Sequence, residues 1–242
     1  MTVHNASNRL RRIPFSARIL MERLSGKTVF EAFHYRESNL TRLVDLFAHV
    51  DVDRWRGMRV LEVGAGHGRL GDAFATLGFD VTSTDGRAKQ VEAMKARGRA
   101  AFELDLDQTG VDEAGDFELI LAFGVLYHLA HPEEFLHSCG KAAKVLLLET
   151  AVCDRREPVV EWVGEAGGWR GTDQALRGQG CRPSPAWVEA TCRKAGFDVV
   201  RDISSPLGDW TSGTYGWEPR DNGEWRRDGV NLRKMWVCER SG

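Results

Sequence analysis

Three glycines on alternate positions, preceded by an acidic residue, form the first group in this sequence that could bind a ligand. They are Gly64, Gly66 and Gly68, and Glu62 stands two positions before the first of them. Apolar residues precede this run and recur at helical spacing after it, so the sequence predicts a buried strand, a tight turn and an amphipathic helix. Glycine adopts positive φ and lets a ligand approach the backbone at the positive end of the helix dipole. The pattern predicts a site for a nucleotide-like ligand.

Further carboxylates follow the next predicted strands. Asp85 lies 21 residues after Gly64, about the spacing at which such folds place an acid on ribose hydroxyl groups. A carboxylate can accept a hydrogen bond from each hydroxyl. Asp105 follows the third strand, and the fourth strand runs into residues 123–129. Because ligands of parallel sheets bind beyond the carboxyl ends of the strands, these residues are expected to line one cleft.

The alternation of strands and helices predicts an α/β fold with a doubly wound, mostly parallel, seven-stranded Rossmann-like sheet. The last strand is expected to be antiparallel, because no crossover helix precedes it. Helices are expected at 68–77 and 87–97, from Pro132, and from the Ser184 cap to Gly196. The expected strands are 60–63, 79–85, 101–104, 117–122, 144–149, 197–200 and 234–238.

The first 57 residues are expected to form a helical cap, and residues 58–242 the ligand-binding domain. Within the cap, one helix is expected over 15–24 and a second after Ser38 as its N-cap. Segments near 153–183 and 203–233 lack a helical period and are rich in glycine and aromatic residues, so we interpret them as lids over the cleft.

The order Glu62-x-Gly64-x-Gly66-x-Gly68, followed by the acids and the 123–129 segment, resembles class I S-adenosylmethionine (SAM) dependent methyltransferases. The sequence does not match the Gly-x-Gly-x-x-Gly fingerprint of dinucleotide-binding folds, because the third glycine of that fingerprint would fall at Arg69. The resemblance implies that the glycine turn holds the amino acid part of SAM, that Glu62 helps to hold its ammonium group, and that S-adenosylhomocysteine (SAH) is the product. The cofactor-binding residues implied are Glu62, Gly64, Ala65, Gly66, Gly68, Asp85, Gly86, Asp105, Leu106 and Phe123.

Candidate catalytic residues lie after the fourth strand. Histidine is the residue type suited to a general base towards an oxygen acceptor, so His128 is a candidate, and Tyr127 offers an aromatic face to a sulfonium. A histidine that only forms a hydrogen bond near the adenine, and rings that only pack the lid, remain alternatives. Because Pro132 starts a new helix just after His131, no metal site is expected at this pair of histidines. Candidate substrate residues are Tyr35, Arg36, Trp210, Tyr215 and Trp217.

The composition limits the partners and the compartment that we expect for this protein. The chain has 242 residues, 42% hydrophobic content and a net charge of -2, so no global basic field attracts nucleic acid. Five cysteines without C-x-x-C spacing favour a reducing cytoplasm. No apolar run reaches the roughly 20 residues of a membrane span. Residues 1–24 fit an amphipathic helix better than a transit peptide, and both monomer and homodimer remain open.

These observations predict a biosynthetic SAM-dependent methyltransferase that acts on oxygen or nitrogen of a small molecule. Residues 124–128, 148–150 and 195–197 also resemble the family that carboxymethylates the wobble uridine of tRNA. Aminocarboxypropyl transfer or cyclisation with release of methylthioadenosine is an alternative in the same fold. A nicotinamide oxidoreductase and a SAM-binding protein without catalysis are the alternatives from other classes.

Overall fold

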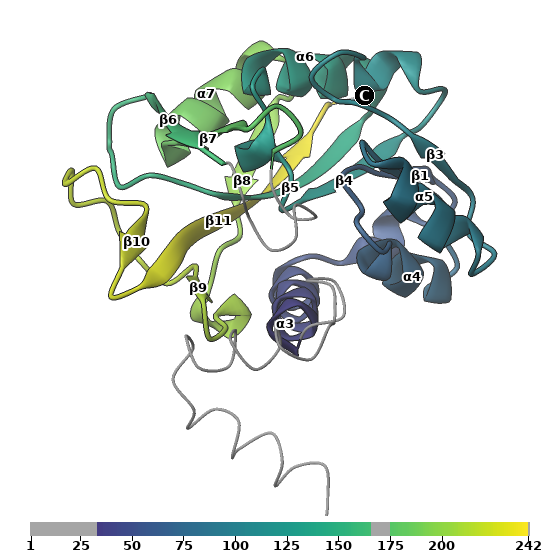
Figure 1. The fold of residues 1–242 in the computed structure, drawn as a ribbon, viewed down its shortest axis with the longest axis horizontal. Coiled ribbons are helices and arrows are strands. Elements are labelled where there is room, and N and C mark those ends of the chain that lie inside the picture. Colours follow the sequence, from purple (N-terminus) through teal and green to yellow (C-terminus); the bar gives the residue numbers. More distant parts are fainter. Residues whose placement is uncertain (1–32, 166–174, 242) are drawn as a thin grey trace, which may run out of the picture.

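The computed structural model describes residues 33–165 and 175–241, and these form one mixed sheet covered by helices (Figure 1). The helix expected over 15–24 lies outside these residues, as does the segment compared with a transit peptide. The division of the chain at residue 57 stays a prediction.

The central sheet has the order β3-β2-β1-β4-β5-β11-β8. The five strands from β3 to β5 are parallel, and β11 is antiparallel to both of its neighbours. The expected doubly wound sheet with an antiparallel last strand is therefore confirmed. The strands are β1 (Arg59–Glu62), β2 (Asp80–Asp85), β3 (Ala101–Glu103), β4 (Leu119–Phe123), β5 (Val145–Ala151), β8 (Val199–Asp202) and β11 (Val230–Glu239).

Helices cover both faces of this sheet, and each face has its own apolar core. Helices α6 (Pro132–Ala142) and α7 (Pro185–Lys194) lie on one face, where Phe135 and Val188 pack against β4 and β5. Helices α3 (Phe33–His49) and α4 (Arg69–Thr76) lie on the opposite face, where Leu46 and Phe74 are completely buried. The remaining helices are α5 (Ala88–Lys95) and the short 3-10 helices η2 (Val52–Trp55), η3 (Val111–Glu113), η4 (Leu126–His128) and η6 (Pro206–Gly208).

The start of α3 differs from the expectation. The helix already includes residues 33–36, whereas the sequence predicted a helix only after Ser38. The Ser38 hydroxyl donates a hydrogen bond to the Tyr35 carbonyl at 2.8 Å within the helix, so Ser38 as N-cap was wrong. By contrast, Ser184 caps α7 as expected, and its hydroxyl accepts from the Trp187 N–H at 3.2 Å.

A separate two-stranded sheet and two short strands added to the central sheet had no clear sequence signal. Strands β6 (Val160–Gly164) and β7 (Gln179–Pro183) form an antiparallel pair within the stretch interpreted as a lid. Strands β9 (Gly213–Thr214) and β10 (Arg226–Arg227) pair with the first part of β11. Among the helices of the described residues, none combines the length and the apolar character needed to cross a membrane.

Candidate functional site

The glycine turn joins β1 to α4 at the carboxyl edge of the sheet. Gly64, Gly66 and Gly68 have φ angles of 59°, 56° and 67°, which residues with side chains rarely adopt. A Cβ at Gly64 would also lie only 2.7 Å from the Cβ of Val125. Both conformation and close packing therefore require glycine at this turn.

Asp85 ends β2 directly beside this turn. Its carboxylate accepts hydrogen bonds from the backbone N–H of Gly66 at 2.8 Å and from that of Arg87 at 3.0 Å. Burial raises the pKa of Asp85 above its ordinary value, although both hydrogen bonds oppose this effect. Each carboxylate oxygen has two lone pairs, so Asp85 can still accept from a ligand.

Glu62 ends β1, and both oxygens of its carboxylate accept hydrogen bonds. It accepts from the Gly71 N–H at 3.0 Å and from the Ser83 hydroxyl at 2.6 Å. Burial raises the pKa of Glu62 to about 7, although these two hydrogen bonds act in the opposite direction. The side chain therefore titrates near neutral pH, and a cation beside it would favour its charged form.

A small cavity lies against the glycine turn. Tyr35 from α3 is one of its lining residues, whereas Arg36 is exposed. Burial raises the pKa of Tyr35 to about 12. The structure thus brings Tyr35 to the expected cofactor residues rather than to the lids. The cavity is lined by Tyr35, Glu62, Val63, Gly64, Ala65, Leu70, Leu121 and Phe123.

Asp105 and its neighbours lie further along the same edge. The Asp105 carboxylate accepts from Arg177 at 2.6 Å and from the Asp107 N–H at 3.1 Å, and Leu106 is buried. Leu176 lies against Gly86, so closely that a Cβ at Gly86 would clash with it. Residues 176–177 therefore lie against Gly86 and Asp105, two of the expected cofactor-binding residues.

The segment after β4 turns at Gly124 and forms η4, which carries both candidate catalytic residues. The Nδ1 atom of His128 forms a hydrogen bond with the Glu165 carboxylate. Burial of Glu165 opposes its ionisation, but the hydrogen bond and charge of His128 and the charge of Arg182 outweigh it and hold the pKa of Glu165 below its ordinary value. Glu165 fixes the orientation of the imidazole, and no sequence pattern had singled it out.

Strand β7 holds η4 in place. The Arg182 guanidinium donates to the Tyr127 carbonyl at 3.2 Å and to Glu165 at 3.0 Å. A Cβ at Gly180 would lie 2.5 Å from the Tyr127 carbonyl oxygen, so the two backbones are in close contact. The β6–β7 pair is thus part of the site.

Glu149, on β5, is the centre of a buried charged network. Its carboxylate contacts Arg42 at 3.0 Å and Arg233 at 3.1 Å, and it accepts from the Tyr215 hydroxyl at 3.0 Å. Glu149 therefore belongs to this network and does not cap a loop. Asp107 does cap a loop, since it accepts from the N–H groups of Ala130 and His131 at 2.8 and 2.9 Å.

The three aromatic residues proposed for the substrate occupy different environments. Tyr215 is 1% exposed and bound to Glu149, and Trp217 is 7% exposed and donates its indole N–H to the Arg233 carbonyl at 3.0 Å. Trp210 is half-buried, and the guanidiniums of Arg42 and Arg233 lie 5.4 and 5.5 Å from its ring centroid. Of the three, Trp210 and Tyr215 belong to the charged network.

The residues present fit an adenosyl amino acid. The turn lines a small cavity together with Glu62, a carboxylate that titrates near neutral pH, and Asp85, which accepts from the Gly66 N–H of the turn, has spare acceptor capacity. Fold and site therefore define a Rossmann-like enzyme of the class that binds SAM.

Comparison with known proteins gives the family. A sequence model described as a methyltransferase domain matches residues 32–202. The chain belongs to this family, the class I SAM-dependent methyltransferases. The N-terminal domain of EvdMO1, solved in the presence of SAH and D-fucose, has a similar fold with a TM-score of 0.63 and 17% identity, covering 86% of this chain and 84% of that one. The glycopeptide N-methyltransferase MtfA complexed with SAM has a TM-score of 0.53 and 18% identity, covering 85% of this chain and 87% of that one.

Curated relatives match over shorter stretches. The ubiquinone biosynthesis O-methyltransferase of Caulobacter sp. (strain K31) is 33% identical over 93 residues, which cover 36% of this chain and 37% of that protein. The enzyme of the same description from Caulobacter vibrioides is 34% identical over 97 residues, which cover 37% and 38%. The chain thus matches less than two fifths of the length of these relatives.

Proposed function

We propose that this protein transfers the methyl group of SAM to an oxygen atom of a small-molecule acceptor. The observation that carries the proposal is the glycine turn fastened to Asp85 through the Gly66 N–H, beside the Glu62 cavity. The ubiquinone biosynthesis relatives support a small-molecule acceptor. We keep nitrogen as the second acceptor atom, because the fold is also that of an N-methyltransferase.

The chain's own residues have distinct tasks in this proposal. SAM, when bound, supplies an electrophilic methyl group on a sulfonium. Gly64 to Gly68 hold its amino acid end, Glu62 faces the ammonium group, and Asp85 accepts from the ribose. Asp105 and Leu106 lie where the adenine would bind, and Tyr35 lines the cavity. Alignment of donor and acceptor and exclusion of water then supply most of the rate.

His128 acts as general base in this scheme. The acceptor oxygen attacks the methyl carbon, its proton passes to the imidazole, and the carbon–sulfur bond breaks with its electron pair on sulfur, which leaves SAH. Glu165 is a positioning residue, because its carboxylate holds Nδ1 and thereby directs the other ring nitrogen away from β6. Tyr127 lies beside the imidazole, with ring centroids 3.9 Å apart.

Cofactor binding provides the first test. Asp85→Ala should weaken SAM binding by about 1–3 kcal/mol in calorimetry, because it leaves ribose hydroxyls without an acceptor. Asp80→Ala is the matched control, since Asp80 is exposed at the opposite end of the same strand. Equal affinities in both variants would reject the assignment, and tighter binding of NADH than of SAM would favour an oxidoreductase.

Turnover provides the second test. Incubation with SAM and panels of phenols, sugars and amines should yield SAH and a methylated product by mass spectrometry, and methylthioadenosine would instead indicate a different SAM-consuming reaction. His128→Ala should lower kcat by about 10²–10⁴-fold for an oxygen acceptor. Glu165→Gln should lower kcat while KM for SAM stays unchanged. A lower melting temperature with unchanged kcat would give Glu165 a structural role only.

The cysteines and the net charge bear on location and partners. We propose a cytoplasmic enzyme, because all five cysteines are buried and free. Monomer and homodimer are both retained, and sedimentation at equilibrium would separate them. Nucleic acid is not proposed as a partner, in line with the net charge of -2.

A further inference from the structure

Three buried arginines surround Tyr127, and we call Arg42, Arg182 and Arg233 the arginine cluster. Each is at most 5% exposed. The guanidinium carbons of Arg182 and Arg233 lie 5.0 and 4.8 Å from the centroid of the Tyr127 ring. Arg42 lies against the backbone after β4, where a Cβ at Gly124 would be 3.1 Å from its Nη2. The cluster therefore adjoins the segment that carries the candidate base.

The cluster contains more positive than negative charge. Arg42 and Arg233 share the single carboxylate of Glu149, and Arg182 shares Glu165 with His128. Three guanidiniums thus face two carboxylates among the described residues. Burying a charge without a counter-charge is costly, so an ion-pair network that serves stability alone is expected to balance.

Two donors in the cluster also lack an acceptor. The Nε atoms of Arg42 and Arg182 are buried and form no hydrogen bond within the part of the chain that the structure describes. More than about nine in ten buried polar groups have a hydrogen-bond partner, so two such donors in one cluster are unusual. Surplus charge and unused donors both indicate a missing anionic acceptor.

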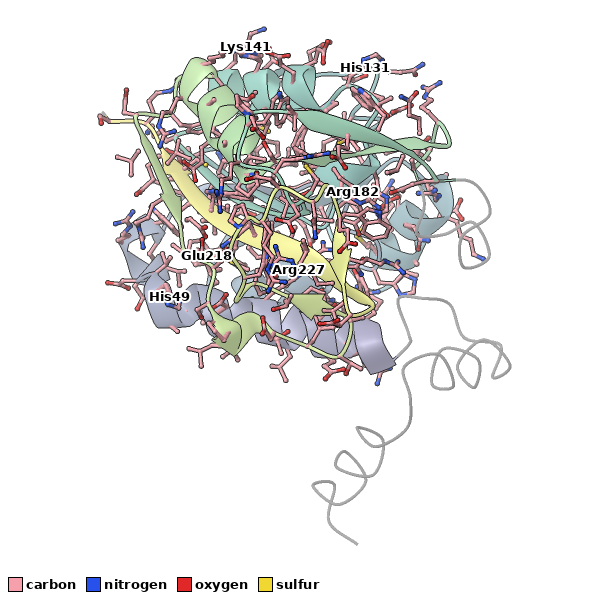
Figure 2. The ribbon with its side chains drawn as sticks, turned by 90° about the vertical axis from the view of Figure 1, so that its left-hand side faces the viewer. His49, His131, Lys141, Arg182, Glu218 and Arg227 are labelled. Carbon is pink, nitrogen blue, oxygen red and sulfur yellow. The ribbon has the colours of Figure 1, made fainter. Side chains whose placement is uncertain are left out.

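The position of the cluster relates it to methyl transfer. Arg42 belongs to the same helix as Tyr35, which lines the cavity at the glycine turn. Arg233 enters from β11, and Trp210 provides a flat wall against Arg42 and Arg233. In Figure 2, Arg182 lies with Arg227 in the middle of the face between α6, which carries Lys141, and α3, which carries His49. A group bound here would lie beside the segment that carries the candidate base.

We propose that the arginine cluster binds a carboxylate or similarly compact anionic group of the methyl acceptor. The guanidinium fork matches a carboxylate through two parallel hydrogen bonds, and the faces of Tyr127 and Trp210 suit a planar acceptor. The assignment of this anion to the acceptor rests on the proposed function. A carboxylate could also come from the amino acid part of the cofactor itself. The test therefore distinguishes a carboxylate of the acceptor from that of the cofactor.

Benzoate and benzamide form the matched pair of probes, because they share one shape and differ in charge. Binding is followed through the melting temperature and tryptophan fluorescence of the whole chain with SAH present. Arg42→Gln is the test variant, since Arg233 remains to pair with Glu149 and the network becomes balanced. Arg54→Gln is the control, because Arg54 also lies over a tryptophan, at 4.8 Å from the Trp55 ring, and pairs with Glu239 far from the site.

Benzoate should raise the melting temperature in a saturable manner, and benzamide should not. Arg42→Gln should weaken benzoate binding by at least about tenfold, whereas Arg54→Gln and wild type should behave alike. Equal responses to both probes, no response to benzoate, or benzoate binding that survives Arg42→Gln would overturn the proposal.

Cofactor affinity separates the two sources of the anion. SAH and adenosine should each bind Arg42→Gln as they bind wild type. If SAH binding weakens while adenosine binding is unchanged, the cluster serves the cofactor carboxylate, and the assignment to the acceptor is wrong. Failure of the proposed function is a separate result: SAM would not bind, yet the benzoate response and its dependence on Arg42 would remain.

Discussion

Glu62→Gln tests the electrostatics of the candidate cofactor site most directly. Glutamine has the shape of protonated glutamate, so it can accept from the Gly71 N–H and donate to the Ser83 hydroxyl. The variant therefore removes the titration of residue 62 and keeps its packing.

The size of the effect follows from burial. The pKa of Glu62 is raised from its ordinary 4.5 to about 7, which corresponds to about 3 kcal/mol at roughly 1.4 kcal/mol per pH unit. Between these two values the folded protein binds more protons at Glu62 than the unfolded chain does, so stability falls as the pH rises. Wild type should lose about 2–3 kcal/mol from this source between pH 5 and pH 8.

Urea unfolding from pH 5 to pH 8, followed by the fluorescence of the eight tryptophans, measures the difference between variant and wild type. The Glu62→Gln variant should gain relative stability across this range, whereas Glu118→Gln, at a partly exposed pair with Lys144, should not. If the Glu62→Gln and wild-type curves stay parallel, Glu62 does not titrate in this window and the reasoning fails. A cation bound beside Glu62 would favour its charged form and so remove this pH dependence of stability. Because the cation of SAM would bind the charged form better, SAM affinity should also rise with pH towards 7.

Three further outcomes are expected. Gly64→Ala should abolish detectable SAM binding in calorimetry, because the new Cβ meets Val125 and the positive φ is strained; retained affinity would contradict the role of the turn. Glu149→Gln should cost about 3–5 kcal/mol in urea unfolding, since it leaves two buried arginines without a counter-charge; a loss below about 1 kcal/mol, as at an exposed pair, would refute this. Burial opposes the ionisation of Glu149, but Arg233 and Arg42 outweigh it and hold its pKa low. The stability that this charge supplies should persist at neutral pH and be lost in acid unfolding only as the pH falls below about 4.5, a loss that the Glu149→Gln variant should lack.

Local patterns in the sequence were sufficient to predict the sheet and the glycine turn beside the end of β2. The glycine turn, the strand that ends at Asp85 and the cap at Ser184 each depend on a few neighbouring residues. These features can be predicted from the sequence because turn geometry, spacing and capping act over short distances along the chain.

The buried charged network and the contact between Glu165 and His128 could not be predicted, because these contacts join distant residues. Arg42 and Glu149 are 107 positions apart and Glu149 and Arg233 are 84 apart, and no periodicity specifies which buried charges will meet. Glu165 likewise reaches His128 only because β6 and β7 pair in a stretch without a strand signal. Tyr215 was read as a lid residue, since its hydrogen bond to Glu149 depends on how β9 and β11 are placed.

The long strand β11 has a consequence for the order of events during synthesis. It pairs with β5, β8, β9 and β10, and it supplies Arg233 to the charged network. While the ribosome still holds residues 230–239, the nascent chain has β1 to β5 but not the strand that covers β5. Glu149 then has Arg42 as a counter-charge without Arg233, and water still reaches both side chains. The final dehydration of these charges must therefore wait until β11 has left the exit tunnel.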